Sequence, residues 1–265
     1  MPASPASTPI RLEYRNVTMR FADRTGGVLT AVRGVNLSVR DGEVVCLIGP
    51  SGCGKSTLLN IGSGLTAPSE GTAFVDGREV AGPNAQVAFM LQKDLLLPWR
   101  TVAENVMFGV EIQRVPLPER RRRAEQLLQQ FSLAEFSGHY PHQLSGGMRQ
   151  RVALARTLAV DPHVLLLDEP FSAVDAQTRI VLQRDLARTL AENGKTALLI
   201  THDLLEAVTL SDRVLVMSRR PGVIIEEIAI DMPLRADPIA RRGDLKVNDY
   251  VARLMDRLDI AHASL

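Results

Sequence analysis

The stretch GPSGCGKST at residues 49–57 decides the fold. It fits the pattern G-x-x-x-x-G-K-[ST], follows the apolar run VVCLI at residues 44–48, and leads into STLLNIGSGL at residues 56–65, which continues as a helix. A buried strand, a Gly-rich turn and a helix in this order form a phosphate-binding loop. We therefore predict an α/β fold built around this loop.

The chemistry of the loop is electrostatic. Its glycines let backbone N–H groups surround a polyphosphate, and the following helix directs the positive end of its dipole at the same anion. Lys55 adds a charge for the β- and γ-phosphates, the Ser56 hydroxyl suits Mg²⁺, and Thr57 suits an α-phosphate oxygen. The predicted ATP-binding residues are Gly49, Pro50, Ser51, Gly52, Cys53, Gly54, Lys55, Ser56 and Thr57.

A second chemical signal is VLLLDEP at residues 164–170, where a buried strand ends in two adjacent carboxylates. The carboxyl ends of strands are where α/β sheets present their ligands. We predict that Asp168 holds Mg²⁺ through water and that Glu169 polarises the attacking water as a general base. Without a phosphate loop upstream, the same acidic pair reads as a solvated turn.

The rest of the pattern indicates a sheet domain with a helical insertion. Residues 10–21 and 35–39 alternate as half-exposed antiparallel strands, and short apolar runs recur at residues 87–90, 164–167, 197–200 and 214–217, as in a parallel core. Residues 93–160 read as helices only, at about 102–113, 119–131 and 146–159. We expect a disordered tail over 1–9, an ATP-binding core over 10–92 and 161–230, a helical subdomain over 93–160, and a C-terminal extension over 231–265.

Composition excludes several classes of function. The 31 basic and 30 acidic residues leave a net charge of +1, which provides no general field for nucleic acid. Apolar runs fall far short of the ~20 residues that a membrane-spanning helix needs, and the opening MPASPASTP lacks the features of a signal peptide. We expect a cytoplasmic protein in which Cys46 and Cys53 act as small side chains, and in which the basic segment 119–123 is a solvated helix face.

The segment LSGGMRQR at residues 144–151 resembles the signature motif of the ABC ATPases. Taken alone, LSGG is merely a helix cap and a turn. The resemblance implies the P-loop NTPase core of that family, with a mixed sheet, an antiparallel β edge and an inserted α-helical signature subdomain. It further implies that Ser145, Gly146 and Gly147 cap the γ-phosphate bound by a second copy of the chain in a head-to-tail dimer.

Further residues fall into the order of motifs found in that family. Gln92 matches the Q-loop glutamine, which reaches the metal and the attacking water, and His202 matches the switch histidine at the γ-phosphate. SAVD at residues 172–175 resembles the D-loop that links the two sites of the dimer. Phe21 stands where the family stacks an aromatic ring on adenine, although Tyr14 is a nearby competitor. The implied catalytic set is Lys55, Gln92, Glu169 and His202, with Ser56, Gln92 and Asp168 at Mg²⁺.

A narrower resemblance links LLLPWRTVAENV at residues 95–106 and SRRPG at residues 218–222 to the nitrate, sulfonate and taurine importer ATPases. It implies that Leu97, Pro98 and Trp99 receive the coupling helix of an integral membrane permease, although Trp99 alone also fits ordinary subdomain core. A solute-binding protein is then an indirect partner, and the chain is peripheral at the cytoplasmic face of the inner membrane. The sequence departs from the family pattern at residues 60–63 and at Val174, and neither departure removes a catalytic group.

Two other functions share the catalytic motifs. An exporter ATPase differs mainly in its permease, which is a separate chain. A non-transport ABC ATPase acting on ribosomes or DNA usually carries two cassettes or a long coiled-coil insertion, and this sequence has neither. The extension at residues 231–265 carries no chemical motif, so we expect edge packing rather than regulation from it.

Overall fold

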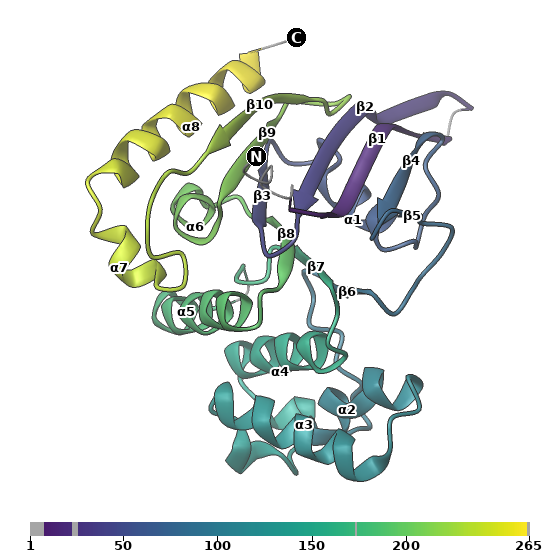
Figure 1. The fold of residues 1–265 in the computed structure, drawn as a ribbon, viewed down its shortest axis with the longest axis vertical. Coiled ribbons are helices and arrows are strands. Elements are labelled where there is room, and N and C mark those ends of the chain that lie inside the picture. The colour runs from purple at the N-terminus through teal and green to yellow at the C-terminus, as the bar shows by residue number, and fades with distance from the viewer. Residues whose placement is uncertain (1–7, 23–25, 173, 264–265) are drawn as a thin grey trace, which may run out of the picture.

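A computed structural model describes residues 8–22, 26–172 and 174–263 (Figure 1). Most of the tail expected at residues 1–9, and Ala173 within the D-loop segment, lie outside the described residues. The strands are β1 (Ile10–Ala22), β2 (Val28–Arg40), β3 (Val44–Ile48), β4 (Glu70–Val75), β5 (Arg78–Glu79), β6 (Val87–Met90), β7 (Val164–Asp168), β8 (Thr196–Ile200), β9 (Arg213–Met217) and β10 (Ile224–Ala229). The α-helices are α1 (Lys55–Gly62), α2 (Val102–Ile112), α3 (Leu117–Gln130), α4 (Gly146–Ala159), α5 (Ala176–Glu192), α6 (Leu204–Leu210), α7 (Pro238–Arg242) and α8 (Lys246–Ala263), and single 3₁₀ turns lie at Ala134–Phe136 and Pro141–Gln143.

The central sheet has six strands in the order β10-β9-β3-β8-β7-β6. Strands β9, β3, β8, β7 and β6 run parallel, and β10 pairs antiparallel with β9 at the edge. Every residue of β3, β7 and β8 is buried, because both faces of these strands are covered. The predicted apolar runs are therefore confirmed as core strands of an α/β fold.

A second sheet, antiparallel in the order β2-β1-β4-β5, covers one face of the first. Helix α1 lies between the two sheets, and the buried Tyr14 hydroxyl of β1 donates a hydrogen bond to the Leu58 carbonyl of α1 at 2.8 Å. The antiparallel pairing predicted for the N-terminal strands is confirmed. The Gly-containing strand β4 and the two-residue β5 are additional to the sequence prediction.

Helices α2, α3 and α4 gather below the sheet in Figure 1. Helix α2 begins with a capping box, in which Thr101 accepts from the Glu104 backbone and Glu104 bonds back to Thr101. The fully buried Asn105 then holds the preceding turn through bonds to Leu97. The three predicted helices are confirmed, and the turn before α2 has a defined shape.

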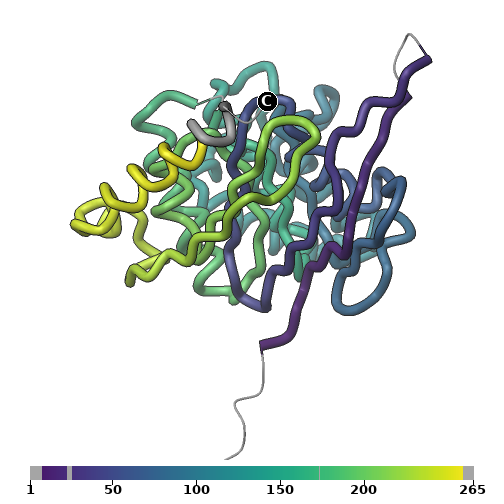
Figure 2. Tube along the Cα trace, turned by 90° about the horizontal axis from the view of Figure 1, so that it is seen from above, coloured from purple at the N-terminus to yellow at the C-terminus, as the bar shows by residue number. Residues whose placement is uncertain are grey.

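Beyond β10, the chain folds back over α5 and α6. The sequence suggested only a polar linker before the last helix, and this was incomplete, because Asp237 caps the short helix α7 and Pro238 occupies its first turn. Helix α8, predicted near residues 247–258, packs on α6, on the side of the molecule opposite the β1–β2 hairpin (Figure 2). Among the described residues, no helix has the length and apolar character needed to cross a bilayer.

Candidate nucleotide site

The loop between β3 and α1 has the geometry of a phosphate cradle. Gly54 adopts a φ of +106°, and a Cβ at this position would collide with the side chain of Val32. The Lys55 ammonium group lies across the loop and donates to the carbonyl oxygens of Gly49 at 2.7 Å and Pro50 at 3.0 Å. The backbone N–H groups at the start of α1 and the Lys55 charge therefore share one small region.

Asp168 ends the buried strand β7 beside this loop. Burial raises the pKa of the Asp168 carboxyl, a hydrogen bond from the Ser56 hydroxyl opposes that rise, and the charge of Glu169 adds to it. A nearby cation would keep this buried carboxyl ionised. Among the described residues no group of three or more His, Cys, Asp or Glu side chains could hold a metal. One carboxylate and one hydroxyl fit Mg²⁺, which usually completes its shell with water and substrate phosphate oxygens.

Glu169 is the meeting point of the predicted catalytic groups. The Gln92 side-chain amide donates to Glu169 Oε2 at 2.9 Å, and His202 Nδ1 lies 3.4 Å from the same oxygen. Strands β7 and β8 are parallel neighbours, with Asp168 opposite Ile200, so their carboxyl ends bring Glu169 and His202 together. The structure thus joins three residues that are far apart in the sequence.

The backbone at Glu169 is strained. Its φ of +46° costs a non-Gly residue roughly 1–3 kcal/mol, and such strain persists only where neighbours enforce it. The Glu169 N–H donates to the Ile200 carbonyl at 3.0 Å, and its own carbonyl accepts from the Ser172 hydroxyl at 3.0 Å. These bonds hold the Glu169 backbone in this conformation.

A cavity of about 400 Å³ adjoins these groups, and residues of β1 and β2 form part of its lining. Phe21 lies in the lining of this cavity and is 42% exposed, whereas the competing aromatic residue Tyr14 is buried in the core. A flat, exposed ring beside the phosphate loop is suited to stacking on a base. The lining residues are Phe21, Leu29, Ala31, Ser51, Gly52, Gly54, Lys55, Ser56, Thr57, Gln92, Glu169 and Arg220.

The signature residues do not line this cavity within one chain. Ser145 caps α4 by accepting from the Met148 N–H at 3.3 Å, and it is exposed. Gly146 and Gly147 open the same helix, and a Cβ on Gly147 would lie 2.8 Å from the Thr178 side chain of α5. The cap predicted from the sequence is present, and its helix end remains accessible.

Sequence reasoning used SRRPG only as a family marker and missed its contact with the phosphate loop. The Arg220 guanidinium donates to the Gly52 carbonyl through Nε at 3.0 Å and Nη2 at 2.7 Å. Gly222 bonds to the Ala31 carbonyl at 2.9 Å, and a Cβ on Gly222 would collide with the Cys53 carbonyl. The turn after β9 therefore packs against the phosphate loop and supports it. The only sign of this contact in the sequence was an arginine within a short Pro-Gly turn.

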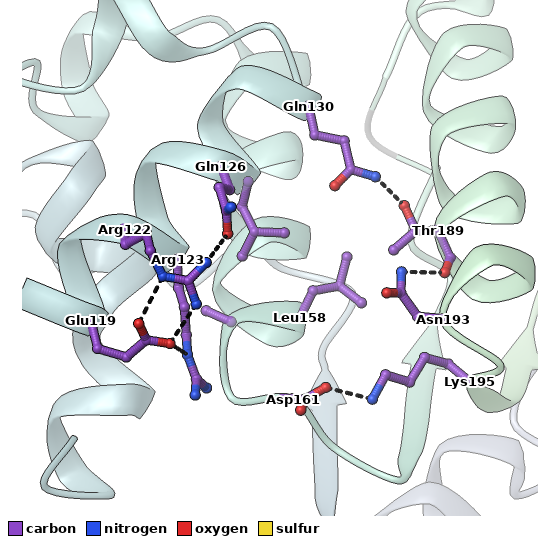
Figure 3. Close-up of a pocket in the computed structure, with 12 residues that line it drawn as sticks. Glu119, Arg122, Arg123, Gln126, Gln130, Leu158, Asp161, Thr189, Asn193 and Lys195 are labelled. Carbon is purple, nitrogen blue, oxygen red and sulfur yellow. Dashed lines mark hydrogen bonds and ion pairs between the residues drawn. The ribbon is translucent and has the colours of Figure 1, made fainter.

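A second cavity, of about 410 Å³, lies between α3, α4 and the end of α5 (Figure 3). None of the predicted catalytic or nucleotide-binding residues lines it. Within it, Arg122 and Arg123 pair with Glu119 on their own helix, and Lys195 pairs with Asp161. Each of the three cations in the lining is already paired with a carboxylate, so this cavity is not a candidate for a second anion site.

Comparison with known proteins decides the family. The ABC transporter family model matches residues 32–172, which is more than half of the chain. The chain belongs to the ABC transporter family. This ABC cassette is 44% identical over 216 residues to a taurine import ATP-binding protein of Jannaschia sp., covering 82% of this chain and 81% of that protein. It is 46% identical over 229 residues to an aliphatic sulfonates import ATP-binding protein of Xanthomonas axonopodis, covering 86% and 91%.

A solved structure agrees with the fold of the cassette. The dimeric post-hydrolysis state of the ATP-binding cassette MJ0796, bound to ADP and phosphate, superposes with a TM-score of 0.75 at 33% identity, covering 83% of this chain and 98% of that one. The P-loop NTPase fold is therefore confirmed. Like its relatives, the cassette is an ATPase of a transport system.

The two cysteines of the cassette give a test of the packing around its phosphate loop. Cys46 and Cys53 are fully buried, and burial raises the pKa of both thiols, although the charge of Lys55 partly opposes this at Cys53. Because a raised pKa lowers the thiolate fraction, alkylation by iodoacetamide at pH 8 is expected to be at least about tenfold slower in the folded than in the urea-unfolded chain. A native thiol that reacts at the unfolded rate would contradict the packing described here.

Proposed function

We propose that this ATPase powers solute import, with two copies closing head to tail on two MgATP molecules and driving a separate membrane permease. The similarity to taurine and aliphatic sulfonates import ATP-binding proteins supports import. Hydrolysis is supported by the convergence of Gln92 and His202 on the Glu169 carboxylate beside the phosphate-loop cavity. A carboxylate oriented by two polar neighbours at a polyphosphate site is suited to activating water.

Each residue has a role that its position supports. Lys55 and the N–H groups of residues 49–57 bind and orient the phosphates, and Phe21 stacks on the adenine. Glu169 accepts a proton from the attacking water, while Gln92 and His202 hold that carboxylate and the water in line. Ser56, Asp168 and Gln92 would hold Mg²⁺, which when bound supplies charge neutralisation for the transferring phosphoryl group.

The second copy completes the site. Ser145, Gly146 and Gly147 lie at an exposed helix N-terminus outside the cavity of their own chain, and such an end favours an anion presented by another molecule. The similar cassette MJ0796 has been solved as a dimer. We infer that the helix end of one copy of this cassette caps the γ-phosphate bound to the other.

The permease contact lies on the turn before α2. Trp99 is 72% exposed and Leu95 is 53% exposed, and Asn105 holds the turn that carries them. Exposed large apolar groups on a rigid turn are typical of a docking site. We propose a peripheral location at the cytoplasmic face of the inner membrane, and taurine, another sulfonate, nitrate or a related small solute as cargo delivered by a solute-binding protein.

The proposal predicts what is co-isolated with the Glu169→Gln protein from native membranes in MgATP. We expect an integral permease and a solute-binding protein by mass spectrometry, and both should be lost when Trp99→Ala is added. A permease recovered without a binding protein would favour export, and ribosomal or DNA-bound partners would overturn the transport function. Substitution of the exposed Ile112, which lies on α2 beyond the turn, provides a control.

A further inference from the structure

Two consecutive arginines of α7 contact the part of the fold around α6, the helix that follows His202. The first, Arg241, is only 2% exposed, although it comes from a short surface helix. Its guanidinium donates to the Ser211 carbonyl at 2.8 Å and the Met232 carbonyl at 2.7 Å, and more weakly to the carbonyls of Val208 and Thr209. The last carbonyls of a helix lack partners within it, so Arg241 closes the carboxyl end of α6.

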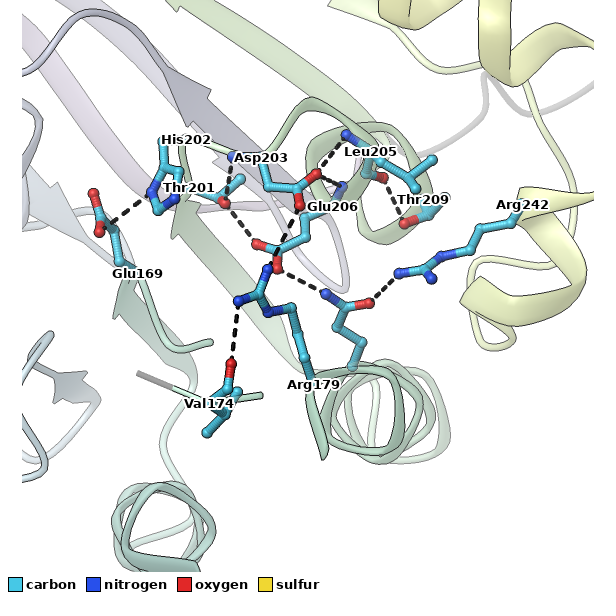
Figure 4. A network of polar contacts seen from close by, with 11 residues as sticks. Glu169, Val174, Arg179, Thr201, His202, Asp203, Leu205, Glu206, Thr209 and Arg242 are labelled. Carbon is cyan, nitrogen blue, oxygen red and sulfur yellow. Dashed lines mark hydrogen bonds and ion pairs between the residues drawn. The ribbon is translucent and has the colours of Figure 1, made fainter. Parts of the chain in front are cut away.

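The second arginine starts a series of hydrogen bonds that runs from the partly buried Arg242 into the core (Figure 4). Arg242 Nη2 donates to Gln183 Oε1 at 2.5 Å, and Gln183 Nε2 donates to Glu206 Oε1 at 2.8 Å. The other Glu206 oxygen accepts from the Thr201 hydroxyl at 2.6 Å. Glu206, Gln183 and Thr201 are all at least 96% buried, so water does not replace the bonds among these three residues.

This series of hydrogen bonds ends at the two residues that flank His202. The Thr201 hydroxyl, held by Glu206, accepts from the Asp203 N–H at 3.0 Å. Asp203 in turn caps α6 by accepting from the N–H groups of Leu205 and Glu206. The backbone on both sides of His202 is therefore fixed from α6, and α6 is fixed from α7.

The order of donors and acceptors along these hydrogen bonds makes the series dependent on Arg242. The Gln183 amide offers one acceptor and one donor end, and the guanidinium occupies the acceptor while the carboxylate occupies the donor. Without Arg242, the buried Gln183 oxygen loses the donor on it, and the orientation of the amide toward Glu206 is no longer fixed. The effect then reaches Thr201, next to the histidine.

We propose that α7 is a positioning element for the switch loop, which acts through Arg242, Gln183, Glu206 and Thr201 to hold His202 against Glu169. This inference rests on the proposed role of His202 in hydrolysis. It assigns to the C-terminal extension a function in ATP turnover, beyond the edge packing expected from the sequence.

The test is steady-state ATPase activity of the full-length Arg242→Met protein, which keeps the aliphatic stem and loses the donors. We expect kcat to fall about tenfold with the KM for ATP changed less than about twofold, since no nucleotide contact is altered. Arg242→Lys should recover part of the loss, because an ammonium group also donates to Gln183. The matched control is Arg253→Met on α8, whose partner Glu226 keeps Arg257.

Coupling to His202 separates positioning from general destabilisation. In the His202→Ala background, Arg242→Met is expected to change kcat by less than about twofold. Two outcomes would overturn this inference and leave the proposed function standing. One is an equal loss of kcat from Arg242→Met in the wild-type and His202→Ala backgrounds. The other is an unchanged kcat for Arg242→Met when His202→Ala is impaired. A normal rate for His202→Ala would remove the histidine assignment and this inference with it. If Arg242→Met does not fold, Gln183→Met breaks the same series of hydrogen bonds and is expected to give the same pattern.

Discussion

Replacement of Glu169 by Gln is expected to lower the ATPase kcat by about 10²–10⁴-fold while leaving MgATP binding intact. The substitution keeps the size of the side chain and an oxygen that accepts from Gln92 Nε2, so the local hydrogen bonding survives. Only the basicity of the group is lost. Because hydrolysis reopens the proposed dimer, the variant should accumulate as a closed dimer in MgATP.

Two measurements check this expectation together. Single-turnover phosphate release reports the chemical step, and size-exclusion chromatography with light scattering in MgATP reports the dimer. Glu192→Gln removes an exposed carboxylate at the end of α5 that pairs only with Arg188 in the described structure, and it serves as the control. Normal turnover by Glu169→Gln would exclude it as the general base.

The parts of the site that are local in sequence were predictable. The phosphate loop follows from strand, turn and helix signals within about twenty residues, and the structure has β3 and α1 on either side of it. The carboxylates at the end of β7 follow from the rule that parallel strands present ligands at their carboxyl ends. Such features depend on short-range patterns that the fold preserves.

The contacts that depend on distant segments were not predictable from those patterns. Arg220 bonds to Gly52, 168 positions away in the sequence, and Arg242 bonds to Gln183, 59 positions away. The residues around each arginine do not distinguish it from an arginine exposed to solvent. The proximity of Gln92 to Glu169 was expected only through the resemblance to ABC ATPases. Helix α7 was missed because five residues carry too little periodicity to distinguish a capped turn from a linker.

Loss of the Lys55 charge is expected to act on binding, in contrast to the loss of Glu169. Lys55 is 9% exposed, and its ammonium group is held over the loop by the carbonyls of Gly49 and Pro50, in the lining of the cavity. Hydrogen bonds to charged groups contribute about 1.5–3 kcal/mol each, so removing this donor from a bound polyphosphate should weaken MgATP binding by at least ~10-fold.

Isothermal titration of Lys55→Ala with MgATP measures this loss directly, and Lys246→Ala, which removes an exposed lysine paired with Asp231, controls for net charge. Thermal unfolding of both variants without nucleotide shows whether the phosphate loop tolerates the substitution. An unchanged affinity in a folded Lys55→Ala protein would mean that the polyphosphate does not lie on residues 49–57. Weak binding with a normal fold would establish the loop as the phosphate site, and together with retained binding by Glu169→Gln it would separate the group that holds ATP from the group that hydrolyses it.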